Sequence, residues 1–509
     1  MFRDPSILSR RSLLTGLLAG VASPLLADAP LRSPRPPARP AADLLAALAP
    51  ESAPLRAPSG PLAALLQRAG LSGETAVIAL DAETGQVIEE HRADLRMPPA
   101  STAKALTTMY ALRALGSEYR FVTRVETQGG AIRNGVLNGD LVLRGGGDPT
   151  LQTAHLARLA AELVERGLRR VEGRFIVDDG ALPGIAQIDP EQPVAAGYNP
   201  GISGINLNFN RVYFGWEPSS GGPRLSMDAR SEREVPPVSV IGIEAVARDL
   251  PVYTYDRRGD QERWTVAASA LGQSGSRWLP VRNPGAYAGD VFRALLAARG
   301  CQVPAPRVQS VPQGQVLAEY RSDPLTSVLR EMLRYSTNIT AECVGLAASL
   351  RLGPRVRSLQ PSAARLNTFV ADRYDAPGIA LMDHSGLSEG SRISVRAMAN
   401  FLLAARREGI LPGLLREHPM RDDNGRTLAS HPVEVRAKTG TLNFVSSLAG
   451  YAQPRGGRAI VFAIVSADMA RRRGISDEES ERPVGARSWT GRARGLQQGL
   501  IERWSGLSG

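Results

Sequence analysis

The sequence predicts an α/β (α+β) protein in which one sheet with helices on its faces is interrupted by a large β-rich insertion. Three observations lead to this prediction. Strand-like runs and a helix come first, a long stretch of short β-like runs follows, and helices, strands and a terminal helix complete the chain. The 509 residues suffice for two or three domains of roughly 150 residues, and the apolar share of 43% is ordinary for a globular protein.

The first residues have the pattern of an export signal. An arginine pair at 10–11 precedes an apolar stretch, 13–26, that ends in a small-x-small sequence at 27–29. The arginine pair followed by Ser-Leu-Leu suits a twin-arginine signal, and the general secretory route stays open. We therefore expect residues 1–29 to be removed on export and residues 30–61, which are rich in Pro and Ala, to form an extended linker. The expected location is periplasmic.

Residues 62–118 are expected to form the first part of the main domain. Runs from Ala76 to Leu80 and from Gln86 to Glu90 are typical of strands and are joined by a Gly-containing turn. The sequence STAKALTTMYALRALG is helical in pattern and stops at its glycine. Ser101 therefore lies near a helix N-terminus, and Lys104 follows one turn later on the same face.

Residues 119–285 are expected to form the insertion. Short β-like runs such as RFVTRVET, GDLVLRG and NRVYFGW alternate with turn residues, and one helix is expected around His155 to Arg166. Residues 286–509 are expected to form the second part of the main domain. Helices dominate 325–350 and 395–408, and three strands and an amphipathic terminal helix follow.

Charge and composition exclude several classes of partner. The net charge is +11, but the arginines are scattered and aromatic residues make up only 5% of the chain. We expect no nucleic acid, because its binders more often carry a basic stripe or stacking aromatics, and only a weak association with an anionic envelope surface. The five His and two Cys show no ligand spacing, so neither a metal nor another cofactor is expected. Cys301 and Cys343 either pair in an oxidising compartment or serve as buried small hydrophobic residues.

Lysine is rare enough in this chain to be informative. Of the 61 Lys and Arg residues, only Lys104 and Lys438 are Lys. Arg keeps its proton in a protein, whereas a desolvated Lys beside another cation can become a neutral base. A general Arg bias explains the arginines and leaves the two lysines as candidates for chemistry.

Both lysines stand in short motifs. Ser101-Thr102-Ala103-Lys104 comes first, Ser336-Thr337-Asn338 is the only Ser-x-Asn in the chain, and Lys438-Thr439-Gly440 comes last. Serine β-lactamases and penicillin-binding proteins carry this set of motifs. Each motif also has a structural interpretation, with the serine as a helix cap, the asparagine as a turn residue and Thr-Gly as the start of a strand.

Four further stretches extend the likeness: GGGDPTL (145–151), YNPGISGINLNFN (198–210), DHSGLS (383–388) and KTGTLNFVSSLAGY (438–451). With them, the sequence resembles the D-alanyl-D-alanine carboxypeptidase/endopeptidase family of the penicillin-binding protein 4 type (peptidase family S13, low-molecular-mass class C). The resemblance extends from about Leu62 to the last helix. It implies a β-lactamase/transpeptidase-like domain with an antiparallel sheet. It also implies peptidoglycan stem peptides as substrates and β-lactam antibiotics as covalent inhibitors.

The resemblance also implies catalytic roles. Ser101 would attack the carbonyl between two D-Ala residues and form an acyl-enzyme, with Lys104 as its base. Ser336 would relay a proton to the leaving amine. Asn338 would hold Lys104 and the substrate amide.

Substrate-binding roles follow in the same way. Lys438, which we count with the catalytic residues, and Thr439 would bind the terminal carboxylate on an edge strand that continues through Gly440. The backbone N–H groups of Ser101 and Thr441 would stabilise the oxyanion.

Three other functions stay open. A non-catalytic peptidoglycan-binding envelope protein would keep the same fold, and a serine β-lactamase would share the acylation step. Nothing in the sequence resembles the extra Glu-and-water arrangement of class A β-lactamases. The stretch GLSEG, Gly386–Gly390, matches the nucleophile elbow of esterases, for which only His418 and His431 follow as a base. We expect His384 to be structural.

One position departs from the family pattern. Many relatives carry Arg directly after SGLS, where it contacts the stem-peptide side chain, but this chain has Glu389. Arg392 is close enough in sequence to take that place. The specificity for the third stem-peptide residue therefore stays open, as does the preference between carboxypeptidase and endopeptidase action.

Overall fold

The computed structural model describes residues 62–353, 355–421, 426–428, 430–476 and 483–506. The expected export signal (1–29) and linker (30–61) lie outside the described residues. Within the described ranges, no helix is both long and apolar enough to cross a membrane.

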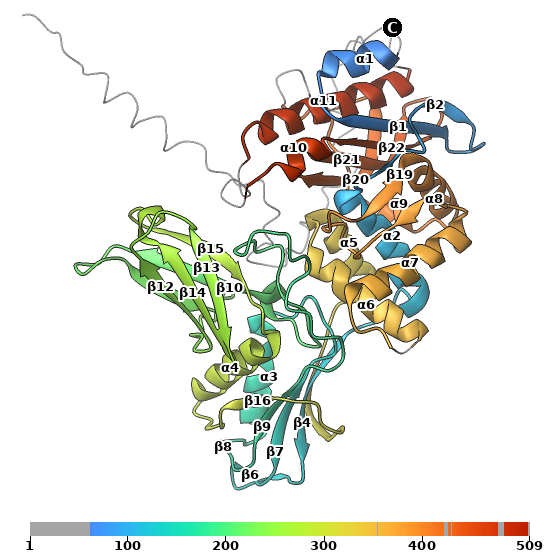
Figure 1. The fold of residues 1–509 in the computed structure, drawn as a ribbon. Helices are drawn as coiled ribbons and strands as arrows, with labels where there is room; N and C mark the ends of the chain where they lie inside the picture. Colours follow the sequence, from blue (N-terminus) through green and yellow to red (C-terminus); the bar gives the residue numbers. More distant parts are fainter. Residues whose placement is uncertain (1–61, 354, 422–425, 429, 477–482, 507–509) are drawn as a thin grey trace, which may run out of the picture.

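A five-stranded antiparallel sheet forms the centre of the main domain, in the order β2-β1-β22-β21-β20 (Figure 1). The first strands of the chain thus pair with the last, as the sequence pattern predicts. The strands are β1 (Glu74–Asp81), β2 (Val87–His91), β20 (Val433–Leu442), β21 (Val445–Pro454) and β22 (Ile460–Ala467). A small sheet, β18-β19-β3, lies nearby and is formed by Ile379–Ala380, Arg392–Ser394 and Arg96–Met97.

Helices cover both faces of the central sheet. Successive side chains of a strand point to opposite faces, so along β1 Val77 packs toward α1 and α11, whereas Ile78 packs toward a second helical layer. Apolar residues therefore follow one another directly in this strand. The helices are α1 (Leu62–Ala69), α2 (Ala103–Leu115), α5 (Leu325–Tyr335), α6 (Asn338–Leu352), α7 (Leu359–Tyr374), α8 (Val395–Arg407), α9 (Leu411–Leu414), α10 (Met469–Arg473) and α11 (Ala486–Trp504).

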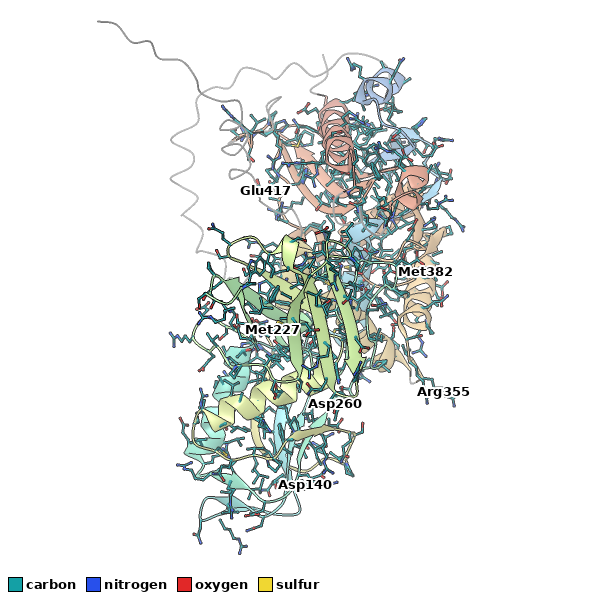
Figure 2. All side chains as sticks on the ribbon, turned by 60° about the vertical axis from the view of Figure 1, so that its left-hand side comes forward. Asp140, Met227, Asp260, Arg355, Met382 and Glu417 are labelled. Atoms are coloured by element: carbon teal, nitrogen blue, oxygen red, sulfur yellow. The ribbon has the colours of Figure 1, made fainter. Side chains whose placement is uncertain are left out.

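The insertion leaves the main domain after α2 and extends away from it (Figure 1). Its main sheet has the order β16-β9-β7-β4-β17 and packs against α3 and α4, and three small sheets have the orders β11-β10-β15, β12-β14-β13 and β5-β6-β8. In Figure 2, Met227 and Asp260 lie in its middle part and Asp140 at its far end. The elements are β4 (Val122–Gln128), β5 (Ile132–Arg133), β6 (Val136–Leu137), β7 (Asp140–Arg144), α3 (Thr153–Glu165), β8 (Arg170–Val171), β9 (Phe175–Asp178), β10 (Arg211–Glu217), β11 (Arg224–Asp228), β12 (Ile241–Val246), β13 (Tyr253–Arg258), β14 (Gln261–Ala267), β15 (Gly275–Pro280), α4 (Pro284–Ala297), β16 (Pro306–Val308) and β17 (Gln315–Arg321).

The insertion ends later than residue 285, where we expected its boundary. That position lies inside α4, whose Tyr287 and Phe292 belong to the hydrophobic core of the insertion. β17 pairs with β4, so the strand that leaves the main domain and the strand that returns lie side by side. Leu325 N donates to Tyr119 O at this crossing. By these contacts, residues 286–321 pack with the insertion and the main domain resumes at α5.

The two cysteines are separate and buried. Cys301 packs in the hydrophobic core of the insertion, whereas Cys343 packs in a cluster around α6, and neither forms a disulfide. Of the two alternatives left open by the sequence, the role of small buried hydrophobic residues is therefore correct.

Candidate active site

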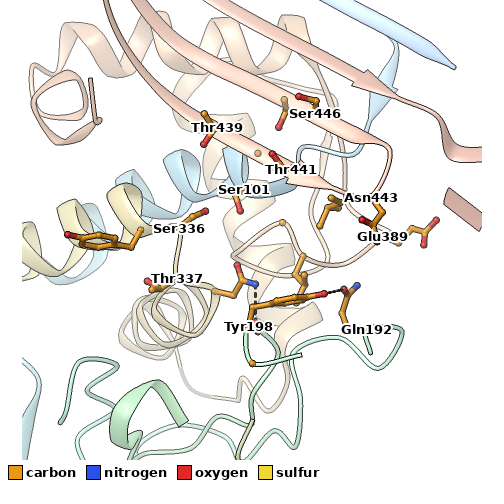
Figure 3. Close-up of a pocket in the computed structure, with 18 of the residues that line it drawn as sticks. Ser101, Gln192, Tyr198, Ser336, Thr337, Glu389, Thr439, Thr441, Asn443 and Ser446 are labelled. Atoms are coloured by element: carbon orange, nitrogen blue, oxygen red, sulfur yellow. Dashed lines mark hydrogen bonds between the residues drawn. The ribbon is translucent and has the colours of Figure 1, made fainter. Parts of the chain in front are cut away.

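The three sequence motifs meet in one cleft of about 1140 Å³, lined by both the main domain and the insertion. Figure 3 shows Ser101, Ser336 and Thr439 facing each other across it. The predicted residues that line the cleft are Ser101, Ser336, Asn338, Thr439, Gly440 and Thr441. The two lysines, Lys104 and Lys438, are buried beneath its surface.

A short turn places the predicted nucleophile beside its base. Ser101 lies in the 3-10 turn η2 (Ala100–Thr102), which leads directly into α2. The hydroxyls of Thr102 and Ser447 hold this turn by donating to Pro99 O at 2.7 and 2.6 Å. One helical turn later, Lys104 Nζ lies 2.9 Å from Ser101 Oγ. The spacing in the sequence thus puts an amine within hydrogen-bond distance of the hydroxyl, as a general base requires.

Burial changes the chemistry of Lys104, whose side chain has no exposed surface. Its Nζ also donates to Asn338 Oδ1 at 2.8 Å and to Ser385 O at 2.9 Å. Burial lowers the pKa of Lys104 to about 8, against the opposing attraction of the Glu342 and Asp383 carboxylates. We expected desolvation and a neighbouring cation to act together, and desolvation is the largest cause. A pKa near 8 leaves a usable neutral fraction at neutral pH.

Two buried carboxylates behind Lys104 are absent from our sequence-based site. Glu342 accepts hydrogen bonds from the backbone N–H groups of His384 and Ser385, both at 2.9 Å. Asp383 accepts from two further backbone N–H groups of the same loop. Burial raises the pKa of both carboxyls, that of Glu342 to about 8. These contacts hold the loop in place, and the Ser385 carbonyl of this loop accepts a hydrogen bond from Lys104 Nζ.

Lys438 and Ser336 form a second pair on the other side of the cleft. Lys438 Nζ donates to Ser336 Oγ at 2.9 Å and to Thr439 O at 2.7 Å. Burial, and then repulsion by the Lys104 ammonium, lower the pKa of Lys438 well below its usual value. Ser336 follows the last residue of α5 as the C-cap of the helix, and its φ is 60°. Residues with a Cβ seldom adopt this left-handed conformation. Such strain concentrates at functional sites.

Asn338 connects the insertion to the base. Its Oδ1 accepts from Lys104, and its Nδ2 donates to Tyr198 O at 3.0 Å. Tyr198 belongs to the insertion, and so do Gln192 and Phe209, which line the same cleft. The insertion therefore supplies one wall of the site.

β20 is the edge strand of the central sheet, and among the described residues a neighbouring segment pairs with its first half alone. Ala437 N donates to Arg416 O, and His418 N donates to Val435 O, so a neighbouring segment pairs with residues 435–437. Beyond them, Thr439, Gly440 and Thr441 line the cleft. An extended peptide can add to an open edge by backbone hydrogen bonds.

Gly440 allows β20 to pass close to the nucleophile turn. A Cβ at this position would lie 2.2 Å from Ser447 Oγ and 2.8 Å from Ser101 N, closer than real Cβ contacts. Any side chain would therefore push the strand and the nucleophile apart.

The surroundings of Glu389 differ from our expectation. Glu389 lines the cleft, whereas Arg392 does not and donates instead to the Glu389 and Ser391 carbonyls. The arginine beside Glu389 is Arg472, whose Nε lies 3.6 Å from Glu389 Oε2 and whose Nη1 donates to Asn443 O at 3.0 Å. The structure therefore gives no support to Arg392 as the replacement for the family arginine.

The esterase alternative finds no support within the described ranges. There, no hydrogen bond joins Ser388, the serine of the elbow sequence, to a histidine. His384 is buried and its Nε2 lies 2.7 Å from Ser362 Oγ. His431 lies beside Glu502, at 3.6 Å. Within the same ranges, no group of three His, Cys, Asp or Glu residues is arranged to hold a metal ion.

Comparisons with known sequences point to one family. Residues 59–481 match the model of the D-Ala-D-Ala carboxypeptidase 3 (S13) family. The D-alanyl-D-alanine carboxypeptidase DacB of Haemophilus influenzae is 26% identical over 422 residues, which cover 78% of this chain and 86% of that protein. A carboxypeptidase of Mycobacterium tuberculosis is 30% identical over 473 residues, which cover 86% of each chain.

Comparison with solved structures confirms the predicted fold. The crystal structure of penicillin-binding protein 4 from Haemophilus influenzae matches with a TM-score of 0.69 at 23% identity, covering 87% of this chain and 100% of that one. The same protein complexed with a β-lactam matches with a TM-score of 0.67 at 22% identity. With the family model matched over most of the chain, the sequence-based recognition is confirmed: the chain belongs to the D-Ala-D-Ala carboxypeptidase 3 (S13) family of peptidases.

Proposed function

We propose that this protein is a periplasmic serine-type D-alanyl-D-alanine carboxypeptidase/endopeptidase that cleaves peptidoglycan stem peptides through an acyl-enzyme on Ser101. One observation carries this proposal: Lys104, buried and with a lowered pKa, lies 2.9 Å from Ser101 Oγ at the floor of a cleft. Family membership, and relatives named as D-alanyl-D-alanine carboxypeptidases, support the substrate class. β-Lactam antibiotics would acylate the same serine.

Acylation begins with the substrate lying along the open half of β20. Lys438 and Thr439 bind its terminal carboxylate, and the backbone N–H groups of Ser101 and Thr441 face the scissile carbonyl oxygen. Neutral Lys104 takes the proton of Ser101 Oγ, which then bonds to the carbonyl carbon.

Collapse of the tetrahedral intermediate breaks the carbon–nitrogen bond. The proton that Lys104 took from Ser101 passes to Ser336, whose hydroxyl lies 2.9 Å from Lys438 Nζ, and on to the leaving amine, so Lys104 is neutral again. Water then gives a proton to Lys104 and bonds to the ester carbonyl carbon. The bond between that carbon and Ser101 Oγ breaks, Ser101 Oγ takes the proton from Lys104, and the shortened peptide leaves as a carboxylic acid.

The test is a covalent adduct on one serine. Incubation with benzylpenicillin is expected to raise the intact mass of the parent protein by one penicillin. Ser101→Ala is expected to abolish the shift because, among the described residues, Ser101 Oγ is the hydroxyl that hydrogen-bonds to Lys104 Nζ. Ser388→Ala, in the esterase-like sequence, is the matched control and should label like the parent. An unlabelled parent would favour a non-catalytic binding protein. Label lost in the Ser388 variant but kept in the Ser101 variant would support the esterase.

Acylation should also depend on pH through Lys104. Only the neutral amine can accept the proton, and its pKa is about 8. The rate constant for penicillin acylation should therefore rise about tenfold per pH unit below pH 8 and level off above it. Stopped assays from about pH 6 to about pH 10, in buffers of matched ionic strength, measure this. A rate that is flat from pH 6 to pH 9 would contradict the role of Lys104 as the base.

A further inference from the structure

One end of the cleft is rich in arginine. The cleft as a whole is lined by seven arginines and only two glutamates. Three of these arginines, Arg416, Arg421 and Arg494, lie around His418 and form with it what we call the arginine cluster; Arg416 also lies near Lys438.

Two elements build the arginine cluster. The segment that pairs with the first half of β20 presents Arg416 and His418 to the cleft, while the residue between them does not line it, as alternation along an extended segment requires. On α11, Arg494 and Gln498 lie one turn apart, and Gln498 Oε1 accepts from Arg421 N at 3.0 Å. The cluster is thus fixed by backbone hydrogen bonds and a helix.

The charges of the arginine cluster lie close enough to affect each other. Burial and the three guanidinium groups lower the pKa of His418 to about 4. Burial and Arg421 lower the pKa of Arg494, and Arg416 contributes to the low pKa of Lys438. Of the two glutamates that line the cleft, Glu389 lies beside Arg472, which is outside the cluster. Cations held side by side attract an anionic ligand.

The position of the cluster matches the side of the leaving group. Thr439 and Ser336 lie on one side of Ser101 in Figure 3, and Asn443 and Glu389 lie on the other. If Thr439 and its neighbour Lys438 bind the carboxylate next to the scissile bond, the part of the leaving group beyond that carboxylate extends toward the arginine cluster. The acyl-donor peptide then lies on the opposite side.

We propose that the arginine cluster is a subsite for an acidic peptide on the leaving-group side, so that cross-linked stem peptides are the preferred substrate. This inference rests on the proposed function. In carboxypeptidase action the leaving group is one D-Ala, whose single carboxylate Lys438 and Thr439 already bind. In endopeptidase action it is a second stem peptide with further carboxylates, which the arginines bind. The same bond, between the D-Ala carbonyl carbon and the amine nitrogen, breaks in both reactions.

The test compares two substrates of the full-length enzyme. kcat/KM is measured at low salt for a purified cross-linked muropeptide dimer and for the uncross-linked pentapeptide. The double variant Arg416→Gln/Arg494→Gln should lower the ratio of the dimer value to the pentapeptide value about tenfold, mainly through KM. Arg487→Gln/Arg492→Gln removes the same two charges from exposed positions of α11 that do not line the cleft, and should leave the ratio unchanged. In the parent, added salt should weaken the preference for the dimer.

Failure of the subsite and failure of the proposed function give different results. An unchanged ratio in the double variant, with the pentapeptide still hydrolysed, would overturn the subsite alone. An equal loss of kcat/KM on both substrates would also overturn the subsite, because the arginines would then act in the acylation step that both reactions share. If the parent hydrolyses neither substrate and penicillin does not label it, the proposed function itself is wrong.

Discussion

Replacing Lys104 with Arg is expected to reduce penicillin acylation and peptide hydrolysis about a thousandfold or more while the protein stays folded. The guanidinium keeps the positive charge that faces the buried Glu342 and Asp383 carboxylates. It cannot give up its proton, so it cannot accept the one from Ser101 Oγ. The measurements are the rate of mass increase with benzylpenicillin and kcat/KM on a D-Ala-D-Ala peptide.

A second variant separates the loss of the base from a loss of folding. Arg is larger than Lys, and position 104 is fully buried, so the thermal midpoint of Lys104→Arg is measured beside that of Lys104→Met. Both variants should lose acylation, since neither supplies a base. If a folded Lys104→Arg protein acylates at the parent rate, the proton of Ser101 goes to another group and the proposed mechanism is wrong.

Replacing Gly440 with Ala is expected to lower acylation about a hundredfold, the cost of a displacement near 1 Å at a reacting group. The added Cβ would lie 2.8 Å from Ser101 N and 2.2 Å from Ser447 Oγ. Either the edge strand or the nucleophile turn must move, and the donors for the oxyanion separate. Penicillin acylation and peptide hydrolysis should both fall, because both use this geometry.

Gly491→Ala is the matched control. Gly491 lies within α11, and a Cβ there would meet nothing within 4 Å. This substitution should leave acylation unchanged and raise the free energy of unfolding by up to about 1 kcal/mol, because Ala favours helix. If Gly440→Ala acylates like Gly491→Ala, the close approach of β20 to Ser101 is not needed for catalysis.

Local sequence patterns were enough to predict most elements of the main domain. The paired strands before Ser101, the helix after it and the late strands all follow from period and turn residues. The end of the insertion could not be predicted in this way, because the apolar pattern of α4 is the same whichever sheet the helix packs against. Glu342 had a readable signal that we missed: it follows Asn338 by four residues and so shares one face of α6.

The sequence by itself was enough to predict the reacting groups. Two lysines among 61 basic residues, and a Ser three positions before one of them, predict a nucleophile and its base, because three residues span one helical turn. Only the tertiary structure decided the rest. It brought Asn338 to Lys104 across 234 positions and placed Tyr198 of the insertion behind it. It also buried Lys104 deeply enough to lower its pKa to about 8. Contacts and desolvation of this kind depend on how distant segments pack, which no local pattern records.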